Sequence, residues 1–167
     1  MSSILNGLRR KKSDAVFDLL GDVDELSAFL GSAKLASSDE EKNIFEEIQK
    51  NLHLIMGIIS NMMQCPEGVI FNEEKYLQLE KLIDKYCEGK DLKNFVLPGG
   101  SEYFSRLHLA RTVCRRAERN YVKFLENINY KKPDKNSEVN FADEGLQKNI
   151  LVYLNRLSDL LFAMSIK

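Results

Sequence analysis

The residues with the clearest chemical potential lie along one predicted helix of this 167-residue sequence. Arg111, Arg115 and Glu118 stand four and three residues apart, so they share one helical face. Two guanidiniums one turn apart offer several fixed N–H donors, a geometry that suits a carboxylate or a polyphosphate. The spacing alone leaves two interpretations open, a salt-bridged helix face at a subunit contact or a clamp for a polyphosphate.

Two other predicted helices carry polar residues among apolar ones. In the last helix, Asn155 and Asp159 share a polar face one turn apart, and spacing alone makes them ordinary polar helix residues. Acidic residues also interrupt an apolar stretch of the first helix, where we expect them to pair with the surplus arginines of the fourth helix. They are Asp22, Asp24 and Glu25.

Histidine and cysteine chemistry is not indicated. His53 and His108 are far apart in the sequence, and neither accompanies a nucleophile motif. Cys65, Cys87 and Cys114 are odd in number and lack CxxC spacing, so we predict neither a disulfide framework nor a zinc site. Free thiols fit a reducing compartment. We expect the cytoplasm, with a mitochondrion or another reducing organelle as the alternative.

The hydrophobic pattern predicts an all-α fold. Apolar residues recur at three- and four-residue steps, which is the period of a helix with one buried side. The predicted helices are about 14–36, 39–65, 72–89, 102–126 and 143 to near the C-terminus. Such helices joined by short connections form a bundle. We predict a single domain over residues 1–167, with an N-terminal arm at 1–13 and an exposed loop at 127–142.

Local signals indicate helix starts and buried sides. Ser38 and Glu41 have capping-box spacing, Ser101 is a good N-cap, and Asn72 before two glutamates predicts another start. The buried side of the first helix is predicted to be Phe17, Leu20, Val23, Leu26, Leu30 and Ala33. That of the fourth helix is predicted to be Leu107, Ala110, Cys114, Ala117, Tyr121 and Phe124.

Composition argues against two function classes. The net charge is −1, and the basic run at residues 9–12 is short, so we expect no nucleic-acid partner. The longest uncharged stretch, roughly 51–66, is shorter than the ~20 apolar residues that a membrane span needs. No secretory signal follows Met1, and we expect no membrane association.

Four ordered segments carry a resemblance to a known family. The sequence contains GDVDEL at 21–26, FVLPGG at 95–100, CRRAER at 114–119 and NRLSD at 155–159. Together they resemble the motifs of the PduO-type ATP:cob(I)alamin adenosyltransferases. The resemblance covers most of the chain, and the motifs fall on the same elements in the same order.

The resemblance implies a homotrimer of five-helix bundles, with ATP bound between neighbouring subunits. The implied reaction transfers the 5′-deoxyadenosyl group of ATP to the cobalt of reduced cob(I)alamin, giving adenosylcobalamin and triphosphate. Mg²⁺ would accompany ATP, because the leaving triphosphate carries several negative charges. An adenosylcobalamin-dependent enzyme would receive the product.

The motifs also imply roles for single residues. Arg115 and Glu118 match the ATP-site pair, with Asn155 beside them. Arg111 would form a salt bridge with Asp24 across the subunit contact. The implied catalytic residues are Arg115, Arg111 and Asp24.

Two further residues are implied to lie on the cobalamin side of the site. Phe95 resembles the aromatic residue that packs beneath the corrin ring and displaces the lower axial ligand of cobalt. Asp159 is assigned to the same side. The alternative for Phe95 is an anchor of the turn.

The N-terminal segment matches only part of the family pattern. Family members carry a T-x-x-G-D-x-G-x-T-S-L segment that cradles phosphates, and residues 2–7 resemble only its tail. On that match the ATP contacts are Ser3, Asn6, Gly7, Arg9 and Lys12.

Two other functions stay open at this point. One is a non-catalytic trimeric corrinoid-binding relative that lacks a complete phosphate cradle. The other is a helical protein that binds acidic partners through the arginines of the fourth helix, which are Arg106, Arg111, Arg115, Arg116 and Arg119.

Overall fold

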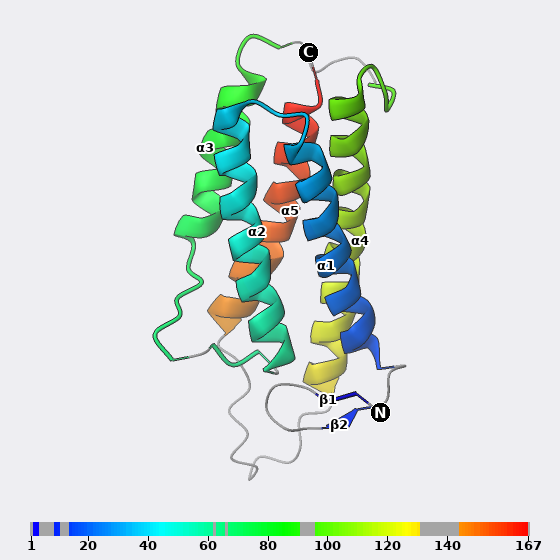
Figure 1. Ribbon diagram of the computed structural model, residues 1–167. Coiled ribbons are helices and arrows are strands. Elements are labelled where there is room, and N and C mark those ends of the chain that lie inside the picture. Colours follow the sequence, from blue (N-terminus) through cyan, green and yellow to red (C-terminus); the bar gives the residue numbers. More distant parts are fainter. Residues whose placement is uncertain are drawn as a thin grey trace.

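Five helices make up most of the computed structural model, which describes residues 2–3, 9–10, 14–61, 63–65, 67–90, 96–130 and 144–166. They are α1 (Ala15–Lys34), α2 (Asp39–Ser60), α3 (Glu74–Cys87), α4 (Glu102–Tyr130) and α5 (Glu144–Met164). Successive helices run in opposite directions along the bundle (Figure 1). The all-α prediction is therefore confirmed.

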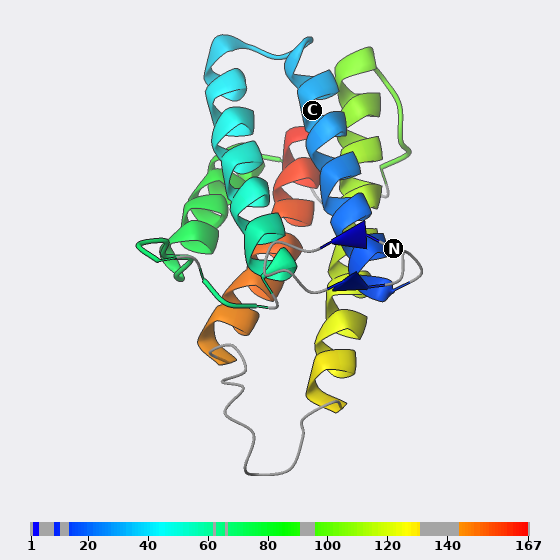
Figure 2. The ribbon, with the colours of Figure 1, turned by 60° about the horizontal axis from the view of Figure 1, so that its bottom comes forward.

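The helices form a bundle in which α1 packs against α2 and α4, α4 packs against α5, and α5 packs against α3 (Figure 2). The helix α4 is the longest, with 29 residues, and spans the length of the bundle. Because α1 and α5 flank it, α4 is held on two sides, and its remaining side is available for other contacts.

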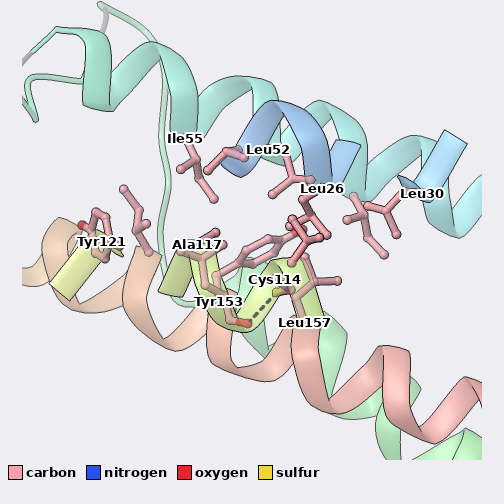
Figure 3. Close-up of a cluster of buried hydrophobic side chains, with 14 of the residues drawn as sticks. Leu26, Leu30, Leu52, Ile55, Cys114, Ala117, Tyr121, Tyr153 and Leu157 are labelled. Carbon is pink, nitrogen blue, oxygen red and sulfur yellow. Dashed lines mark hydrogen bonds between the residues drawn. The ribbon is translucent and has the colours of Figure 1, made fainter. Parts of the chain in front are cut away.

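Four of the helices contribute to the apolar interior. Figure 3 shows Leu26 of α1, Leu52 of α2, Ala117 of α4 and Tyr153 of α5 meeting at the centre, each fully buried. The six residues predicted to form the buried side of the fourth helix are all buried. The helix α3 is peripheral, since its single buried residue is Leu79.

Two predicted caps are confirmed. Ser38 accepts a hydrogen bond from the Glu41 backbone N–H, while the Glu41 carboxylate accepts one from the Ser38 N–H at 2.9 Å, completing the capping box. At the start of α4 the Ser101 hydroxyl accepts from the Phe104 N–H at 3.1 Å. These side chains satisfy backbone donors that a helix start leaves unpaired.

A lysine binds backbone carbonyls at the C-terminal end of α5. The Lys90 Nζ donates to the backbone oxygen of Ile166 at 2.5 Å and lies 3.4 Å from that of Ala163. The last carbonyls of a helix have no partner within the helix and form the negative end of its dipole, so a cation there is stabilising. The segment after α3 is thereby attached to the end of α5.

The structure corrects four predictions about the helices. The second helix ends at Ser60 rather than near residue 65. The predicted loop at 127–142 begins too early, because α4 continues to Tyr130. Ile128, four residues after Phe124, is also buried and extends the apolar side by one turn. Residues 131–142 of that predicted loop lie outside the described part of the chain.

The other two corrections concern a helix start and a buried side. The helix α3 begins at Glu74, and Asn72 contributes its backbone carbonyl to the Lys75 N–H rather than a side-chain cap. In α1, Phe17 and Leu20 are only half-buried. Val16 and Leu19 occupy the interior, which moves the first two contacts of the predicted stripe by one residue.

Part of the N-terminal arm pairs with itself. The strands β1 (Ser2–Ser3) and β2 (Arg9–Arg10) are antiparallel, with Ser3 opposite Arg9. The pair lies at the end of the bundle where α1 begins (Figure 1). Among the described residues, no helix is both long and apolar enough to cross a lipid bilayer.

Candidate functional site

The polar face of α4 carries cations that the described part of the chain leaves uncompensated. Arg115 is exposed, and within the described residues its side chain has neither an ion pair nor a hydrogen bond. One turn earlier, the Arg111 Nε is buried and has no hydrogen-bond partner there. Burying a guanidinium donor without a partner costs free energy, so this face is suited to receive an anion or an acidic side chain.

A network of polar side chains joins this face to α5. The Asn155 amide donates to the Glu118 carboxylate at 2.9 Å, and Arg156 donates to the Asn155 carbonyl oxygen at 2.8 Å. Arg156 also lies 3.4 Å from the Asp159 carboxylate. The structure therefore brings together three predicted site residues, Glu118, Asn155 and Asp159, in one bonded chain across two helices.

A different arginine neutralises the acidic residues of α1. The Arg116 Nε donates to the Asp22 carboxylate at 2.7 Å, and the same guanidinium binds Glu25. Asn120, one turn further along α4, donates to the second Asp22 oxygen at 2.6 Å. The predicted pairing between the two helices is confirmed for these acids.

Asp24 stays outside that cluster. It is exposed on α1, and no ion pair or hydrogen bond of its side chain is present among the described residues. Of the five arginines considered for binding acidic partners, Arg116 is engaged with α1, and Arg106 binds Glu102 and the Ser32 carbonyl. The cations available on α4 are therefore concentrated around Arg111, Arg115 and Arg119.

Sequence reasoning missed the contribution of Asn120. It follows Arg116 by four residues, so both side chains reach the same place on α1. That spacing was a signal that could have identified it. Asn120 acts on Asp22, which is 8% exposed, and a buried carboxylate is stable only when its oxygens are bonded.

A buried histidine lies one turn before Arg111. His108 is 4% exposed, and its Nδ1 has no hydrogen-bond partner. Burial lowers the pKa of His108, and the neighbouring Arg111 guanidinium lowers it further. Both effects favour the neutral imidazole, which keeps a second positive charge away from the Arg111 side chain.

His108 makes stability depend on pH in a defined direction. Its pKa in the folded protein lies below the unfolded value of 6.5, so below pH 6.5 the unfolded chain binds the proton more readily. We expect the free energy of unfolding to fall as the pH drops from 6.5 to 5.5, by at most about 1.4 kcal/mol per pH unit. Urea denaturation of His108→Gln should show a flatter profile. The matched variant His53→Gln removes an exposed histidine and should keep the slope of the parent.

Cys114, inside the arginine-rich motif, is a core residue. Its thiol donates to the Leu154 carbonyl at 3.2 Å, and burial raises its pKa well above the usual range. Figure 3 shows it within the apolar cluster. A buried, protonated thiol is a poor nucleophile, so Cys114 packs α4 against α5 rather than reacting.

The remaining predicted site residues lie elsewhere or outside the described chain. Phe95, Asn6, Gly7 and Lys12 fall in segments that are not described. Ser3 and Arg9 belong to the β1–β2 pair.

The described parts of the predicted site are spread along the bundle. The β1–β2 pair lies at the opposite end from the turn that leads into α4 (Figure 1). Arg115 is thirteen residues into α4, about 20 Å from its start. The predicted site residues that the structure describes are therefore not gathered into one pocket of a single chain.

No metal cage is present on this face. Among the described residues, no three histidine, cysteine, aspartate or glutamate side chains come close enough together to hold an ion. The fold and the face together define a helical-bundle protein that presents partly uncompensated arginines beside a carboxylate–amide network.

Comparison with known proteins places this bundle in a family. The family model described as cobalamin adenosyltransferase matches residues 1–167. The chain is 33% identical to the corrinoid adenosyltransferase MMAB of Mus musculus over 174 aligned residues, covering 98% of this chain and 66% of that protein. It is 33% identical to the corrinoid adenosyltransferase of Bacillus subtilis, covering 95% of this chain and 77% of that one. The chain belongs to the cobalamin adenosyltransferase family.

Solved structures agree with this assignment. A variant of the PduO-type ATP:corrinoid adenosyltransferase from Lactobacillus reuteri, complexed with cobalamin and ATP, superposes with a TM-score of 0.78 at 28% identity. The match covers 98% of this chain and 85% of that one. The chain spans 66% of the length of the mouse relative and 45% of the Salmonella typhimurium PduO protein.

Proposed function

We propose that this protein transfers the 5′-deoxyadenosyl group of ATP to the cobalt of reduced cob(I)alamin and releases triphosphate. The observation that carries the proposal is the exposed Arg115, which has no partner among the described residues and lies beside the Glu118–Asn155 pair on a family-matched helix. The related Lactobacillus reuteri variants are complexed with ATP and, in two of three cases, with cobalamin as well. Both molecules are substrates in this proposal.

The chemistry of the step explains why cations are needed. The cobalt(I) electron pair forms a bond to the 5′ carbon of ATP while the bond from that carbon to the triphosphate oxygen breaks. The triphosphate leaves with the bonding electrons, so negative charge grows on its oxygen. Arg115 would stabilise that charge through its fixed N–H fork, an interaction that strengthens in the transition state.

Other residues of the same face would orient the nucleotide. Glu118 is held by the Asn155 amide at 2.9 Å, which fixes its carboxylate relative to α5. Such a fixed acceptor suits a ribose hydroxyl or the adenine amino group. Asn155, with Arg156 bound to its carbonyl oxygen, is the rigid support on the α5 side.

The N-terminal arm and the turn before α4 would complete the substrate contacts. Ser3, Asn6, Gly7, Arg9 and Lys12 are proposed to approach the phosphates. Phe95 would pack beneath the corrin with Asp159 on the same side. We propose that Mg²⁺ enters bound to the triphosphate, as this ion is usually held by few protein ligands and several phosphate or water oxygens.

We also propose that the working unit is a homotrimer with ATP at each subunit contact. Two observations support this proposal: among the described residues, the buried Arg111 Nε has no hydrogen-bond partner and the Asp24 carboxylate has no ion pair. Each could form an ion pair with a neighbouring subunit. The spread of the candidate residues along the bundle supports it as well. Residues from two chains can meet where residues of one chain cannot.

The chemistry of the reaction also bears on the cell compartment and on the fate of the product. Cob(I)alamin is a strong reductant, and the thiols Cys65, Cys87 and Cys114 are free. We propose a reducing compartment, the cytoplasm first, and an adenosylcobalamin-dependent enzyme as the receiver of the product.

An anaerobic assay tests the function directly. Reduced cobalamin, ATP and Mg²⁺ are mixed with the protein, and the visible spectrum is followed for the alkyl-cobalt product. We expect ATP-dependent conversion and stoichiometric triphosphate. Corrinoid binding that occurs without conversion and without dependence on ATP would instead establish the non-catalytic alternative.

A charge swap tests the subunit contact. Arg111→Glu and Asp24→Arg each place like charges at the proposed ion pair, so we expect either variant to lose the trimer at micromolar concentration and at least ~10-fold of its activity. The double variant restores opposite charges at every contact and should recover the trimer. Sedimentation velocity measures the assembly. If both single variants sediment as the parent does, the proposed contact is wrong.

A further inference from the structure

The side of the bundle away from the α4 arginines contains a cavity between α2 and α3. Its volume is about 270 Å³, and its walls are mostly apolar. The apolar lining consists of Ile44, Ile48, Leu79 and Leu82, and the polar lining of Asn43, Glu47, Asn51, Lys75 and Gln78. All of these residues belong to α2 or α3, so the cavity shares none with the proposed adenosylation site.

One deep residue of the lining has an unused hydrogen-bonding atom. Asn51 is 3% exposed, and its Oδ1 has no hydrogen-bond partner. The buried Tyr153 hydroxyl of α5 has no hydrogen-bond partner either. Burial raises the pKa of Tyr153, and the nearby Asn51 side chain opposes part of that rise. A buried amide oxygen without a donor is costly, and a ligand that supplies a donor would relieve the cost.

The charged residues at the opening of the cavity determine which ligand charge is favoured. Glu47 of α2 and Lys75 of α3 face each other there, with their charged atoms 3.7 Å apart. The two charges compensate each other, so the mouth favours neither an anion nor a cation.

We propose that this cavity is a binding site for a small, neutral, mainly apolar molecule with one hydrogen-bond donor at its inner end. The apolar walls would take the body of the molecule, and Asn51 Oδ1 would accept from the donor. The volume lies near the lower limit for ligand pockets, which restricts the occupant to about the size of a bicyclic heteroaromatic ring. The site is independent of adenosyl transfer.

Two probes of equal size distinguish the contribution of the hydrogen-bond donor to binding from that of the apolar body. Indole has one N–H donor, whereas 1-benzofuran has the same shape and none. Each is titrated into the ¹⁵N-labelled full-length protein, and amide chemical shifts are followed by NMR. We expect saturable shifts clustered on residues 43–51 and 75–82, a dissociation constant for indole of roughly 1 mM or tighter, and about fivefold weaker binding of 1-benzofuran.

Three variants define where the probes bind. Asn51→Leu should remove the preference for indole over 1-benzofuran. Leu82→Phe fills the cavity from a half-buried position and should weaken both probes at least ~10-fold. Leu77→Phe is the matched control, because Leu77 is 40% exposed on the same helix and does not line the cavity.

Two results would overturn the proposal. One is the absence of saturable shifts, which means that the cavity holds only water. The other is binding that Leu82→Phe leaves unchanged, which places the probes elsewhere. Equal affinity of indole and 1-benzofuran for the parent protein would remove the role of Asn51. Leu82→Phe keeps the test decisive even if Asn51→Leu does not fold.

Discussion

Arg115→Ala should abolish adenosyl transfer while leaving the bundle folded. Arg115 is exposed and makes no hydrogen bond or ion pair within the described residues, so its removal costs the fold little. In the proposed reaction it meets charge that develops on the leaving triphosphate, and loss of one such donor lowers kcat roughly 10²–10³-fold. The anaerobic spectral assay at saturating ATP measures this loss.

Two companion variants separate charge from geometry. Arg115→Lys keeps the charge and loses the planar fork, so we expect partial activity between those of Arg115→Ala and the parent. Lys123→Ala removes another exposed cation of the same helix and should change kcat less than about twofold. If Arg115→Ala retains the parent kcat, Arg115 does not contact the leaving group and the proposed mechanism fails.

Arg116→Ala should destabilise the protein more than any other arginine substitution on α4. Arg116 binds Glu25 and also Asp22, whose side chain is 11% exposed. Without the guanidinium, Asp22 keeps only Asn120 as a partner, and a buried carboxylate is left half-compensated. We expect a loss of about 2 kcal/mol, or a decrease in Tm of roughly 4–8 °C.

Arg119→Ala is the control for that loss. Arg119 is exposed on the same helix and has no ion pair in the described chain, so its removal should cost less than about 0.5 kcal/mol. Urea denaturation at one fixed protein concentration compares the variants, because the stability of an oligomer depends on concentration. Equal midpoints for Arg116→Ala and Arg119→Ala would show that the Asp22 contact contributes nothing measurable.

The helical architecture was predictable because its signals are local. A buried stripe at helical spacing, as in residues 107–124, depends on neighbours three and four positions away. The Ser38–Glu41 box and the Ser101 cap are likewise contained within four residues. Those predictions are confirmed, and the errors lie near helix ends. Ile128 extends the buried side of α4 by one turn, which the polar residues around it made difficult to predict.

The pairing of charges was only partly predictable, because it depends on how two helices are rotated against each other. Sequence spacing placed Arg111, Arg115 and Glu118 on one face but could not tell that Arg116 would take the acids of α1. Asp22 and Asp24 are two residues apart and point in different directions from α1, but spacing alone cannot tell which of the two faces α4. The packing of α1 on α4 makes that choice. The ATP and corrin roles came from family motifs rather than from geometry, and they remain predictions.

Lys90 is attached to the carbonyls of Ala163, in the last turn of α5, and of Ile166, just after it, which lie 73 and 76 positions further along the sequence. Any unravelling of the last turn of α5 must release this ammonium group, and release of the ammonium frees the chain just before the turn into α4. Unravelling of the C-terminal turn therefore costs the free energy of the Lys90 contacts as well as that of the helical hydrogen bonds.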